Sequence, residues 1–363
     1  MRVIIACAGS GGHINPGIAI ANIIKAREPD SSILFIGTKT GLENELVKKA
    51  GYEIKSIRAG RLHRSFTLEN VKNLYNAALG ITDSKKIIKE FKPDIVIGTG
   101  GYICVSVMKA ASMLKVPYVL HESNVYPGLS VKLNAKRASK ILVGFDETKK
   151  YLPNANVVYT GTPAKFNTDT IDALSKTKCK QELKLDNKKV VFVTGGSQGA
   201  KKLNETVIKM IKKYMPKDFF TVIAVGHKNF DTVKAKIGSD CDKYIKVEKY
   251  IYDMDKMYKA SDLLITRAGA MTVLELEIAA KPAILIPLPT AAENHQYFNA
   301  KVLEKNNAGL VIEEKDLNED VLYERIMRYI TDASLLKEMG KNARKLVMEN
   351  VEDRIYEEIK SAK

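Results

Sequence analysis

Several features that would place this chain in a special class of proteins are missing from it. No apolar run approaches the roughly 18 residues that a membrane-spanning helix needs. The four cysteines (Cys7, Cys104, Cys179 and Cys241) lie far apart and form no C-x-x-C pair, which argues against a zinc site and a disulfide framework. The first residues enter a strand-like run without the basic segment and apolar core of a signal peptide. We therefore expect a cytoplasmic protein.

Nucleotide and nucleic-acid motifs are also missing. The sequence contains no G-x-x-x-x-G-K-[ST] segment, and neither of its strand-turn-helix openings matches G-x-G-x-x-G, which disfavours P-loop and dinucleotide-binding proteins. Net charge is +16, from 58 Lys and Arg against 42 Asp and Glu. The lysines are spread over the whole chain, and no zinc finger or RNA-binding aromatic motif accompanies them. This charge favours phosphorylated substrates or an acidic membrane face over nucleic acid.

Short apolar runs alternate with helical patterns along the chain, which predicts βαβ units and parallel sheets. The segment TGTPAKFN interrupts the alternation, and we interpret it as a hinge between two domains. The strands are expected at Val3–Cys7, Ser32–Ile36, Ile54–Ile57, Ile95–Gly98, Tyr118–Leu120, Lys140–Val143, Val157–Tyr159, Val190–Thr194, Phe220–Val225, Tyr244–Val247, Leu263–Thr266, Ala283–Ile286 and Gly309–Ile312.

The opening RVIIACAGSGG has a counterpart, KVVFVTGGSQGAKKLN, at the start of the second half. Each is a buried strand followed by a glycine turn and a helix, so the chain is expected to form two Rossmann-like α/β domains. The N-terminal domain is predicted at residues 1–162, joined by a C-terminal helix at 350–363. The other domain is predicted at residues 163–349.

The first glycine turn, AGSGGHINPG, favours an anion site. Asn15 and Pro16 suit the N-cap and first position of a helix running from Gly17 to Arg27. Exposed backbone N–H groups before a helix attract phosphate, although a tight turn that needs positive φ explains the glycines equally well. A third glycine turn, TRAGAMT, precedes a helix containing Glu275, whose carboxylate suits a ribose diol or the helix dipole.

Eight ordered motifs resemble one enzyme family over essentially the whole chain. They are GSGGHINPG, KPDIVIGTGGY, VPYVLHESNVYPG, GTPAKF, VTGGSQGAKKLN, YIYDM, RAGAMTVLE and ENHQYFNA. The family is the peptidoglycan N-acetylglucosaminyltransferases, inverting enzymes of peptidoglycan synthesis that convert lipid I to lipid II. The resemblance implies a GT-B fold, with two Rossmann-like domains of parallel sheets facing across a cleft.

The resemblance places UDP-N-acetylglucosamine (UDP-GlcNAc) on the second domain, with Ser197 on the phosphates, Ile251 on the uracil and Glu275 on the ribose. The family has threonine where this chain has Ser10, which keeps the hydroxyl. It has arginine where this chain has Lys165, and lysine keeps the charge but lacks the bidentate fork, so direct contact with the donor is in doubt at Lys165. The complete set of expected donor residues is Ser10, Gly11, Gly12, Asn124, Lys165, Ser197, Ile251, Ala270, Met271, Thr272, Val273, Leu274, Glu275 and Gln296.

The resemblance assigns two glycine turns of the first domain to the acceptor, which is linked to a lipid through a pyrophosphate. The residues concerned are His13, Thr99, Gly100, Gly101 and Tyr102. Inverting transfer needs a base for the acceptor hydroxyl, and we favour His13, which titrates in the useful range. Glu122 is the rival base. The structural alternatives are that His13 binds the diphosphate or orders its turn, and that Glu122 is a buried acid holding a loop.

No cofactor or metal is expected. Asp253 and Asp255 form a D-x-D, which we interpret as acids at the start of a helix. Helix dipoles and lysines are expected to stabilise the leaving UDP.

A helix covering Leu68, Val71, Tyr75 and Ala78 carries an apolar stripe followed by lysines. Such stripes usually lie in a core, but a lipid-linked acceptor favours peripheral contact with an anionic inner leaflet at the cytoplasmic face of the cell membrane. The expected membrane residues are Phe66, Leu68, Val71, Tyr75, Leu79, Lys85 and Lys86.

Two other interpretations remain open from the sequence. One is a different GT-B enzyme that uses a nucleotide sugar, such as a diacylglycerol glycosyltransferase or a UDP-GlcNAc 2-epimerase. The other is a non-catalytic subunit of a transferase complex, which disagrees with the presence of His13, Glu275 and Gln296. The resemblance leaves cell-wall or division complex proteins open as partners.

Overall fold

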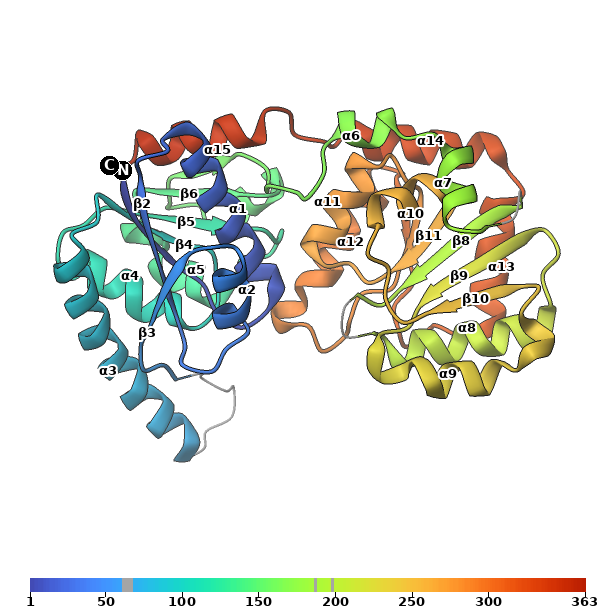
Figure 1. Ribbon diagram of the computed structural model, residues 1–363, viewed down its shortest axis with the longest axis horizontal. Helices are drawn as coiled ribbons and strands as arrows, with labels where there is room; N and C mark the ends of the chain where they lie inside the picture. The colour runs from blue at the N-terminus through green and yellow to red at the C-terminus, as the bar shows by residue number, and fades with distance from the viewer. Residues whose placement is uncertain (61–67, 186–187, 197–198) are drawn as a thin grey trace. The chain divides into compact units, whose positions relative to one another are not determined.

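The computed structural model describes residues 1–60, 68–185, 188–196 and 199–363, and it divides into two compact units. Unit 1 comprises Met1–Ala164 and Met348–Lys363, and unit 2 comprises Lys165–Val347. Each unit has a parallel sheet with helices on both faces, as Figure 1 shows for each unit by itself. The chain leaves unit 1 at the segment predicted as a hinge and returns to it for its last helix.

Unit 1 is built on a seven-stranded sheet of order β3-β2-β1-β4-β5-β6-β7, with every neighbouring pair parallel. Its central strands β1 and β4 are apolar and buried apart from Arg2 at the start of β1, as expected for strands buried on both faces. The strands are β1 (Arg2–Ala6), β2 (Ser32–Gly37), β3 (Glu53–Ser56), β4 (Ile95–Gly98), β5 (Tyr118–Glu122), β6 (Lys140–Val143) and β7 (Val157–Tyr159). The helices are α1 (Gly11–Arg27), α2 (Glu43–Lys49), α3 (Leu68–Phe91), α4 (Ile103–Met113), α5 (Leu129–Asn134), η1 (Ala135–Arg137), η2 (Asp146–Tyr151) and α15 (Val351–Lys360).

Unit 2 repeats this plan with a six-stranded parallel sheet of order β10-β9-β8-β11-β12-β13. Its strands are β8 (Lys189–Thr194), β9 (Phe219–Ala224), β10 (Ile245–Glu248), β11 (Leu263–Thr266), β12 (Ala283–Leu285) and β13 (Gly309–Val311). Its helices are α6 (Thr168–Ala173), α7 (Lys176–Glu182), α8 (Lys201–Tyr214), η3 (His227–Asn229), α9 (Phe230–Ile237), η4 (Ser239–Cys241), α10 (Met254–Ala260), α11 (Ala270–Ile278), η5 (Ala292–Asn294), α12 (His295–Lys305), α13 (Glu319–Ile330) and α14 (Ala333–Arg344).

The strand order reverses at one point in each sheet, and this point locates the ligand crevice in open α/β folds. In unit 1 the chain runs outward from β1 to β3 and then returns to place β4 beside β1. In unit 2 the corresponding neighbours are β8 and β11. The glycine turns singled out in the sequence follow these four strands.

All thirteen predicted strands are present, and their ends differ from the prediction by at most two residues. The start of α1 was predicted wrongly: the helix begins at Gly11, and Pro16 lies inside it. The N–H groups of His13 and Ile14 both donate to the Ser10 carbonyl, at 3.0 and 3.2 Å, and this starts the helix before the proline. Pro16 removes a bond to the carbonyl of Gly12, which has no side chain to crowd the ring.

The last helix, α15, packs on the same sheet face as α1 and buries Ile355 and Ile359 completely. The Tyr356 hydroxyl donates to Glu28 at 2.8 Å, and the amino group of Met1 donates to the same carboxylate at 2.8 Å. These contacts fix the end of the chain to unit 1.

No helix within the described residues is long and apolar enough to cross a membrane. The four cysteines are free and buried. Burial raises the pKa of Cys104 to about 12, so its thiol stays protonated at neutral pH.

Candidate functional site

The turns after β1 and β4 lie against each other in unit 1. Gly100 (φ +117°) and Gly101 (φ +87°) adopt left-handed conformations, and a Cβ on Gly101 would lie 2.2 Å from the Ala8 carbonyl oxygen. The Thr99 N–H donates to Ala6 O at 3.1 Å, and the Thr99 hydroxyl donates to the carbonyl of His13 at 2.8 Å. Glycine is therefore required by close backbone approach, and the two glycine turns meet at one place.

The His13 imidazole lies over Gly100, at the place where the two glycine turns meet. A Cβ on Gly100 would be 2.4 Å from His13 Cδ2, so the ring occupies the space that a side chain would need. His13 Nδ1 is 3.2 Å from the Ala8 carbonyl oxygen. Because a carbonyl only accepts, Nδ1 is the donor in this contact, and in the neutral ring the lone pair is then on Nε2. A half-buried imidazole with a free basic nitrogen is suited to take a proton.

Glu122, at the end of β5, is buried and holds the loop that follows it. Its Oε1 accepts from the Asn124 N–H at 2.9 Å and from Asn124 Nδ2 at 3.0 Å, while Oε2 accepts from the Gly128 N–H at 2.8 Å. Three donors already use this carboxylate. The geometry therefore favours the loop-holding interpretation over the rival-base interpretation.

Glu43 is a buried carboxylate that sequence reasoning did not single out. It is fully buried at the first position of α2, and its Oε2 accepts from the Gly9 N–H at 3.3 Å. Its Oε1 accepts from the Thr38 N–H at 2.8 Å and the Thr38 hydroxyl at 2.6 Å. A Cβ on Gly41 would meet Oε1 at 2.2 Å, so Gly41 leaves room for this carboxylate. The loop after β2 is thus joined to the loop after β1.

In unit 2 the loop after β8 also has left-handed glycines. Gly196 has φ +77° and Gly199 has φ +72°, and a Cβ on Gly199 would lie 2.4 Å from the Val225 carbonyl oxygen. Ser197, the expected phosphate ligand, lies outside the described residues. The helix α8 starts directly after this loop.

The turn after β11 leads into α11, whose N-cap is Gly269. The N–H groups of Ala270, Met271 and Thr272 occupy the first turn, where a helix offers donors without intrahelical partners. Val273 donates to the Gly269 carbonyl at 3.0 Å and is fully buried, so it offers no free group to a ligand. Ala270, Met271, Thr272 and Leu274 are half-buried.

Glu275, one turn further along α11, has a perturbed carboxyl group. Burial raises its pKa above the ordinary value, while the Tyr258 hydroxyl and the ammonium charge of Lys165 act in the opposite direction. Tyr258 donates to Glu275 Oε2 at 2.9 Å and is itself completely buried. The structure thus places exposed Lys165 in the electrostatic surroundings of Glu275, both within unit 2.

Gln296 lies in the first turn of α12 and connects two loops at the carboxyl edge of the sheet. Its Oε1 accepts from the Ala268 N–H at 3.2 Å and from the Leu288 N–H at 3.0 Å. With the oxygen used in this way, the amide nitrogen remains available to donate to a ligand hydroxyl.

Two residues of this region were missed from the sequence. Asn299 is fully buried and donates to the Ala268 carbonyl at 3.1 Å. Arg267, 8% exposed, donates to the carbonyls of Ile286 and Pro287 and forms an ion pair with Glu314. Both residues lie in motifs already quoted, RAGAMTVLE and ENHQYFNA, and that was the available signal.

One further expected donor residue, Ile251, lies in the loop between β10 and α10. Ile251 is half-buried in this loop. Asp253 is the N-cap of α10 and Asp255 lies in its first turn, where both charges suit the helix dipole. No cluster of metal-binding side chains occurs among the described residues. Ser10, Gly11, Gly12 and Asn124 belong to unit 1, and the other donor residues belong to unit 2.

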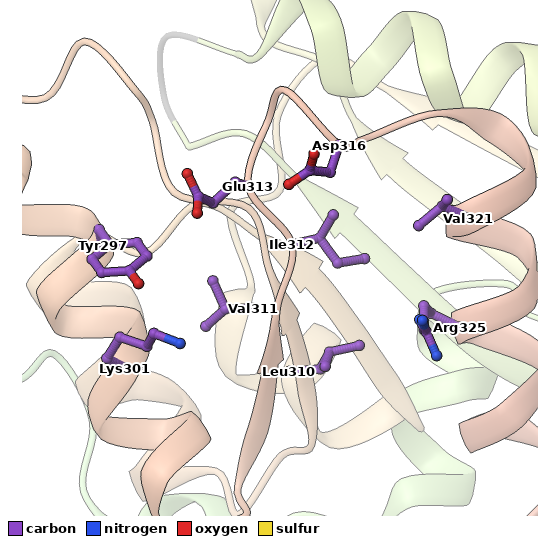
Figure 2. A pocket seen from close by; sticks show the side chains of 9 residues that line it. All are labelled: Tyr297, Lys301, Leu310, Val311, Ile312, Glu313, Asp316, Val321 and Arg325. Atoms are coloured by element: carbon purple, nitrogen blue, oxygen red, sulfur yellow. The ribbon is translucent and has the colours of Figure 1, made fainter.

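A separate pocket of about 370 Å³ runs beside the edge strand β13. Figure 2 shows Tyr297 and Lys301 from α12 on one side and Val321 and Arg325 from α13 on the other. The N–H of Val311, in the strand between them, donates to the Glu304 carboxylate at 2.9 Å. A carboxylate that caps an edge strand blocks strand addition, so we interpret this pocket as a protected sheet edge.

Comparison with known proteins agrees with this architecture. The model of the glycosyltransferase family 28 N-terminal domain matches residues 3–143, and that of the family 28 C-terminal domain matches residues 190–355. Among solved structures, MurG of Acinetobacter baumannii has a TM-score of 0.81 at 24% identity and covers 99% of both chains. A UDP co-structure of MnaA from S. aureus has a TM-score of 0.69 at 18% identity, covering 99% of this chain and 96% of that one. These likenesses show the fold, the GT-B pair of parallel α/β domains.

Sequence similarity goes further. A curated protein of Acetivibrio thermocellus is 40% identical over 362 residues, covering 99% of this chain and 98% of its own length. One of Alkaliphilus metalliredigens is 39% identical over 363 residues, with coverages of 99% and 98%. Both are named UDP-N-acetylglucosamine--N-acetylmuramyl-(pentapeptide) pyrophosphoryl-undecaprenol N-acetylglucosamine transferase. The chain therefore belongs to this family of N-acetylglucosamine transferases, within the family 28 glycosyltransferases.

Proposed function

We propose that this protein transfers N-acetylglucosamine from UDP-GlcNAc to the 4-hydroxyl of N-acetylmuramic acid in undecaprenyl-pyrophosphoryl-MurNAc-pentapeptide, forming lipid II from lipid I. The observation that carries this proposal is the 40% identity, over 99% of the chain, to a transferase named for these substrates. The paired glycine turns after β1 and β4 support it, because glycine turns of this kind form concave sites whose backbone N–H groups bind anions such as a diphosphate.

In the proposed reaction His13 is the general base. The acceptor 4-oxygen attacks the anomeric carbon, its proton passes to His13 Nε2, and the bond from that carbon to the UDP oxygen breaks. The contact from Nδ1 to the Ala8 carbonyl supports this role because it makes Nδ1 the donor, so that in the neutral ring Nε2 is the nitrogen that can accept a proton. Glu122 holds the Asn124 loop in this scheme.

The donor is assigned to unit 2. Its diphosphate lies at the turn after β8 and the start of α11, where helix N-termini stabilise the negative charge that develops on UDP. Glu275 accepts from the ribose hydroxyls, and Gln296 donates to the sugar. We propose that the reaction needs no divalent metal.

The test is transfer of labelled GlcNAc from UDP-GlcNAc to a lipid I analogue, with and without a chelator. Wild-type protein should transfer in both conditions. His13→Ala should lower kcat by about 10²- to 10⁴-fold, the usual contribution of a general base, while UDP-GlcNAc still binds. Glu122→Gln, which keeps most of the loop contacts, should lower kcat far less.

Several results would contradict the proposal. Tight UDP-GlcNAc binding without transfer would remove the lipid I assignment, and 2-epimerisation of the donor alone would replace it. Loss of transfer in chelator, restored by a divalent ion, would reject the metal-free mechanism.

We also propose that unit 1 binds the cytoplasmic face of the membrane through the N-terminal half of α3, drawn in blue in Figure 1. Leu74 is 62% exposed and Tyr75 is 64% exposed, which burial in a core would not allow. Leu79 and Lys85 are half-buried and Lys86 is exposed. The side chains of Leu68 and Val71, and all of Phe66, lie outside the described residues.

Co-sedimentation with vesicles tests this surface. Leu74→Ser combined with Tyr75→Ser should reduce binding to vesicles containing anionic lipid while leaving transfer to a short-chain soluble acceptor unchanged. Met215→Ser is the matched control, since Met215 is also exposed (48%) but lies in unit 2. Equal binding by both variants would contradict the assignment.

A further inference from the structure

Unit 1 contains a second cavity that the proposed reaction leaves unassigned. Its volume is about 740 Å³, within the roughly 300–1,000 Å³ of small-molecule sites. It lies at the carboxyl ends of β2 and β3, and residues of α3 form another wall. The lining consists of Thr38, Lys39, Thr40, Lys55, Ser56, Ile57, Arg58, Ala59, Asn76, Asp83, Lys86, Ile87, Glu90 and Tyr102.

The cavity has an excess of positive charge. Arg58 donates to Asp83 through Nε at 2.8 Å and Nη2 at 2.6 Å, and Lys55 is 3.6 Å from Glu90. Lys39 and Lys86 are exposed and form no ion pair with any residue in the part of the chain that the structure describes. Two ammonium groups are thus available for an anion.

This cavity adjoins the acceptor turns. Tyr102, which ends the GTGGY motif, is one of its lining residues. On another side, Thr38 shares the Glu43 carboxylate with Gly9 of the first glycine turn. One buried side chain, that of Glu43, therefore separates the cavity from the glycine turn that is proposed to bind the diphosphate.

The chemistry of the lining favours a peptide over a lipid chain. Thr40 and Asn76 offer a hydroxyl and an amide that pair with peptide N–H and C=O groups, whereas a polyprenyl chain needs an apolar groove. The hydroxyls of Thr38 and Ser56 already donate to Glu43 and to the Thr38 carbonyl, and they can still accept from a peptide N–H. The acceptor named for the relatives carries a pentapeptide, which ends in a carboxylate. A carboxylate between two ammonium groups forms charge-assisted hydrogen bonds.

We propose that this cavity binds the peptide of the acceptor, with Lys39 and Lys86 pairing its carboxylate. The assignment rests on the proposed function. It makes the two lysines specificity-determining residues that act at binding and touch none of the reacting atoms.

The test compares two lipid I analogues that differ only in the peptide, one with free carboxylates and one with every peptide carboxylate converted to a carboxamide. For wild-type protein the carboxamide acceptor should have a KM about tenfold higher, as expected for losing a hydrogen bond between charged groups. The double variant Lys39→Gln, Lys86→Gln should show this higher KM for both acceptors. Its kcat, its KM for UDP-GlcNAc and its Tm should be unchanged.

The matched control is Lys48→Gln combined with Lys89→Gln, which removes the same charge from exposed positions outside the cavity lining. It should discriminate between the two acceptors as wild type does. A double variant that still discriminates would overturn the assignment, and so would one that loses binding to anionic vesicles with no change in peptide discrimination. Absence of transfer to either acceptor by wild-type protein would overturn the proposed function itself.

Discussion

Gln296 and Asn299, one turn apart on α12, both form hydrogen bonds with the backbone of Ala268. Gln296 Oε1 accepts from the Ala268 N–H at 3.2 Å, and Asn299 Nδ2 donates to the Ala268 carbonyl at 3.1 Å. Ala268 directly precedes Gly269, the N-cap of α11. The position of the N–H groups at the start of α11 therefore depends on two amides of a different helix.

Substitution of Gln296 should weaken donor binding. Gln296→Ala leaves the N–H groups of Ala268 and Leu288 without their acceptor, and it removes the amide proposed to bind the sugar. Losing such contacts costs about 1–3 kcal/mol, so we expect a KM for UDP-GlcNAc at least about tenfold higher. Steady-state kinetics with the acceptor saturating measures it. Asn306→Ala, at the end of the same helix, should leave this KM unchanged, and an equal rise there would contradict the argument.

The ion pair between Arg267 and Glu314 should matter for stability. Arg267 is buried and its side chain also donates to two carbonyls after β12. Arg267→Met should lower the free energy of unfolding by about 3–5 kcal/mol, because Glu314 loses its partner in a partly buried setting. Denaturant titration measures this. The exposed pair of Lys315 and Glu313 provides the control, since Lys315→Gln should change stability by less than about 0.5 kcal/mol. Equal losses in the two variants would reject the distinction.

The sequence predicted the strands well because a strand buried on both faces is a continuous apolar run that needs no tertiary information. It failed at the start of α1, where Asn15 and Pro16 carry a local signal for a helix start. Tertiary contacts outweighed that signal: the Thr99 hydroxyl binds the His13 carbonyl, and Gly17 packs so closely that a Cβ would lie 3.0 Å from Thr99 Oγ1. Such contacts join residues far apart in the chain, and local patterns do not encode them.

The same reason explains which site residues were missed. The turns with His13 and Gly100 were found because glycines after strands are visible in the sequence. Glu43, Arg267 and Asn299 are ordinary helix or loop residues by local pattern. Only the fold shows that each is a buried polar group bonded to a loop beside the proposed site.

Donor binding should depend on pH through Glu275. Burial raises its pKa above the ordinary value of 4.5, so on acidification the carboxylate is protonated earlier than an exposed glutamate. Because ribose recognition needs the ionised form, UDP affinity should fall as pH decreases through that raised pKa. Titration calorimetry with UDP over a pH series measures it. For stability the sign is opposite: the buried neutral form contributes stability at low pH, and this contribution is lost as pH rises through the folded-state pKa.

Two variants check the assignment to Glu275. Glu275→Gln should bind UDP more weakly but with no pH dependence in this interval. Tyr258→Phe removes a hydroxyl that lowers the pKa of Glu275, so it should move the loss of affinity to higher pH. A pH profile unchanged in both variants would assign the titration to a different group.

Glu43 should control acceptor binding without touching the acceptor. In Glu43→Gln the amide oxygen can still accept from Thr38, but the amide nitrogen then faces the Gly9 N–H, and two donors oppose each other. The resulting shift of the first glycine turn should raise the KM for the acceptor about tenfold, the cost of losing one hydrogen bond to a charged group. The KM for UDP-GlcNAc should stay the same. Glu45→Gln is the matched control, because Glu45 lies in the same first turn of α2 but is exposed. If both KM values rise together in Glu43→Gln, or if Glu45→Gln has the same effect, Glu43 stabilises unit 1 in general and does not position the acceptor turn.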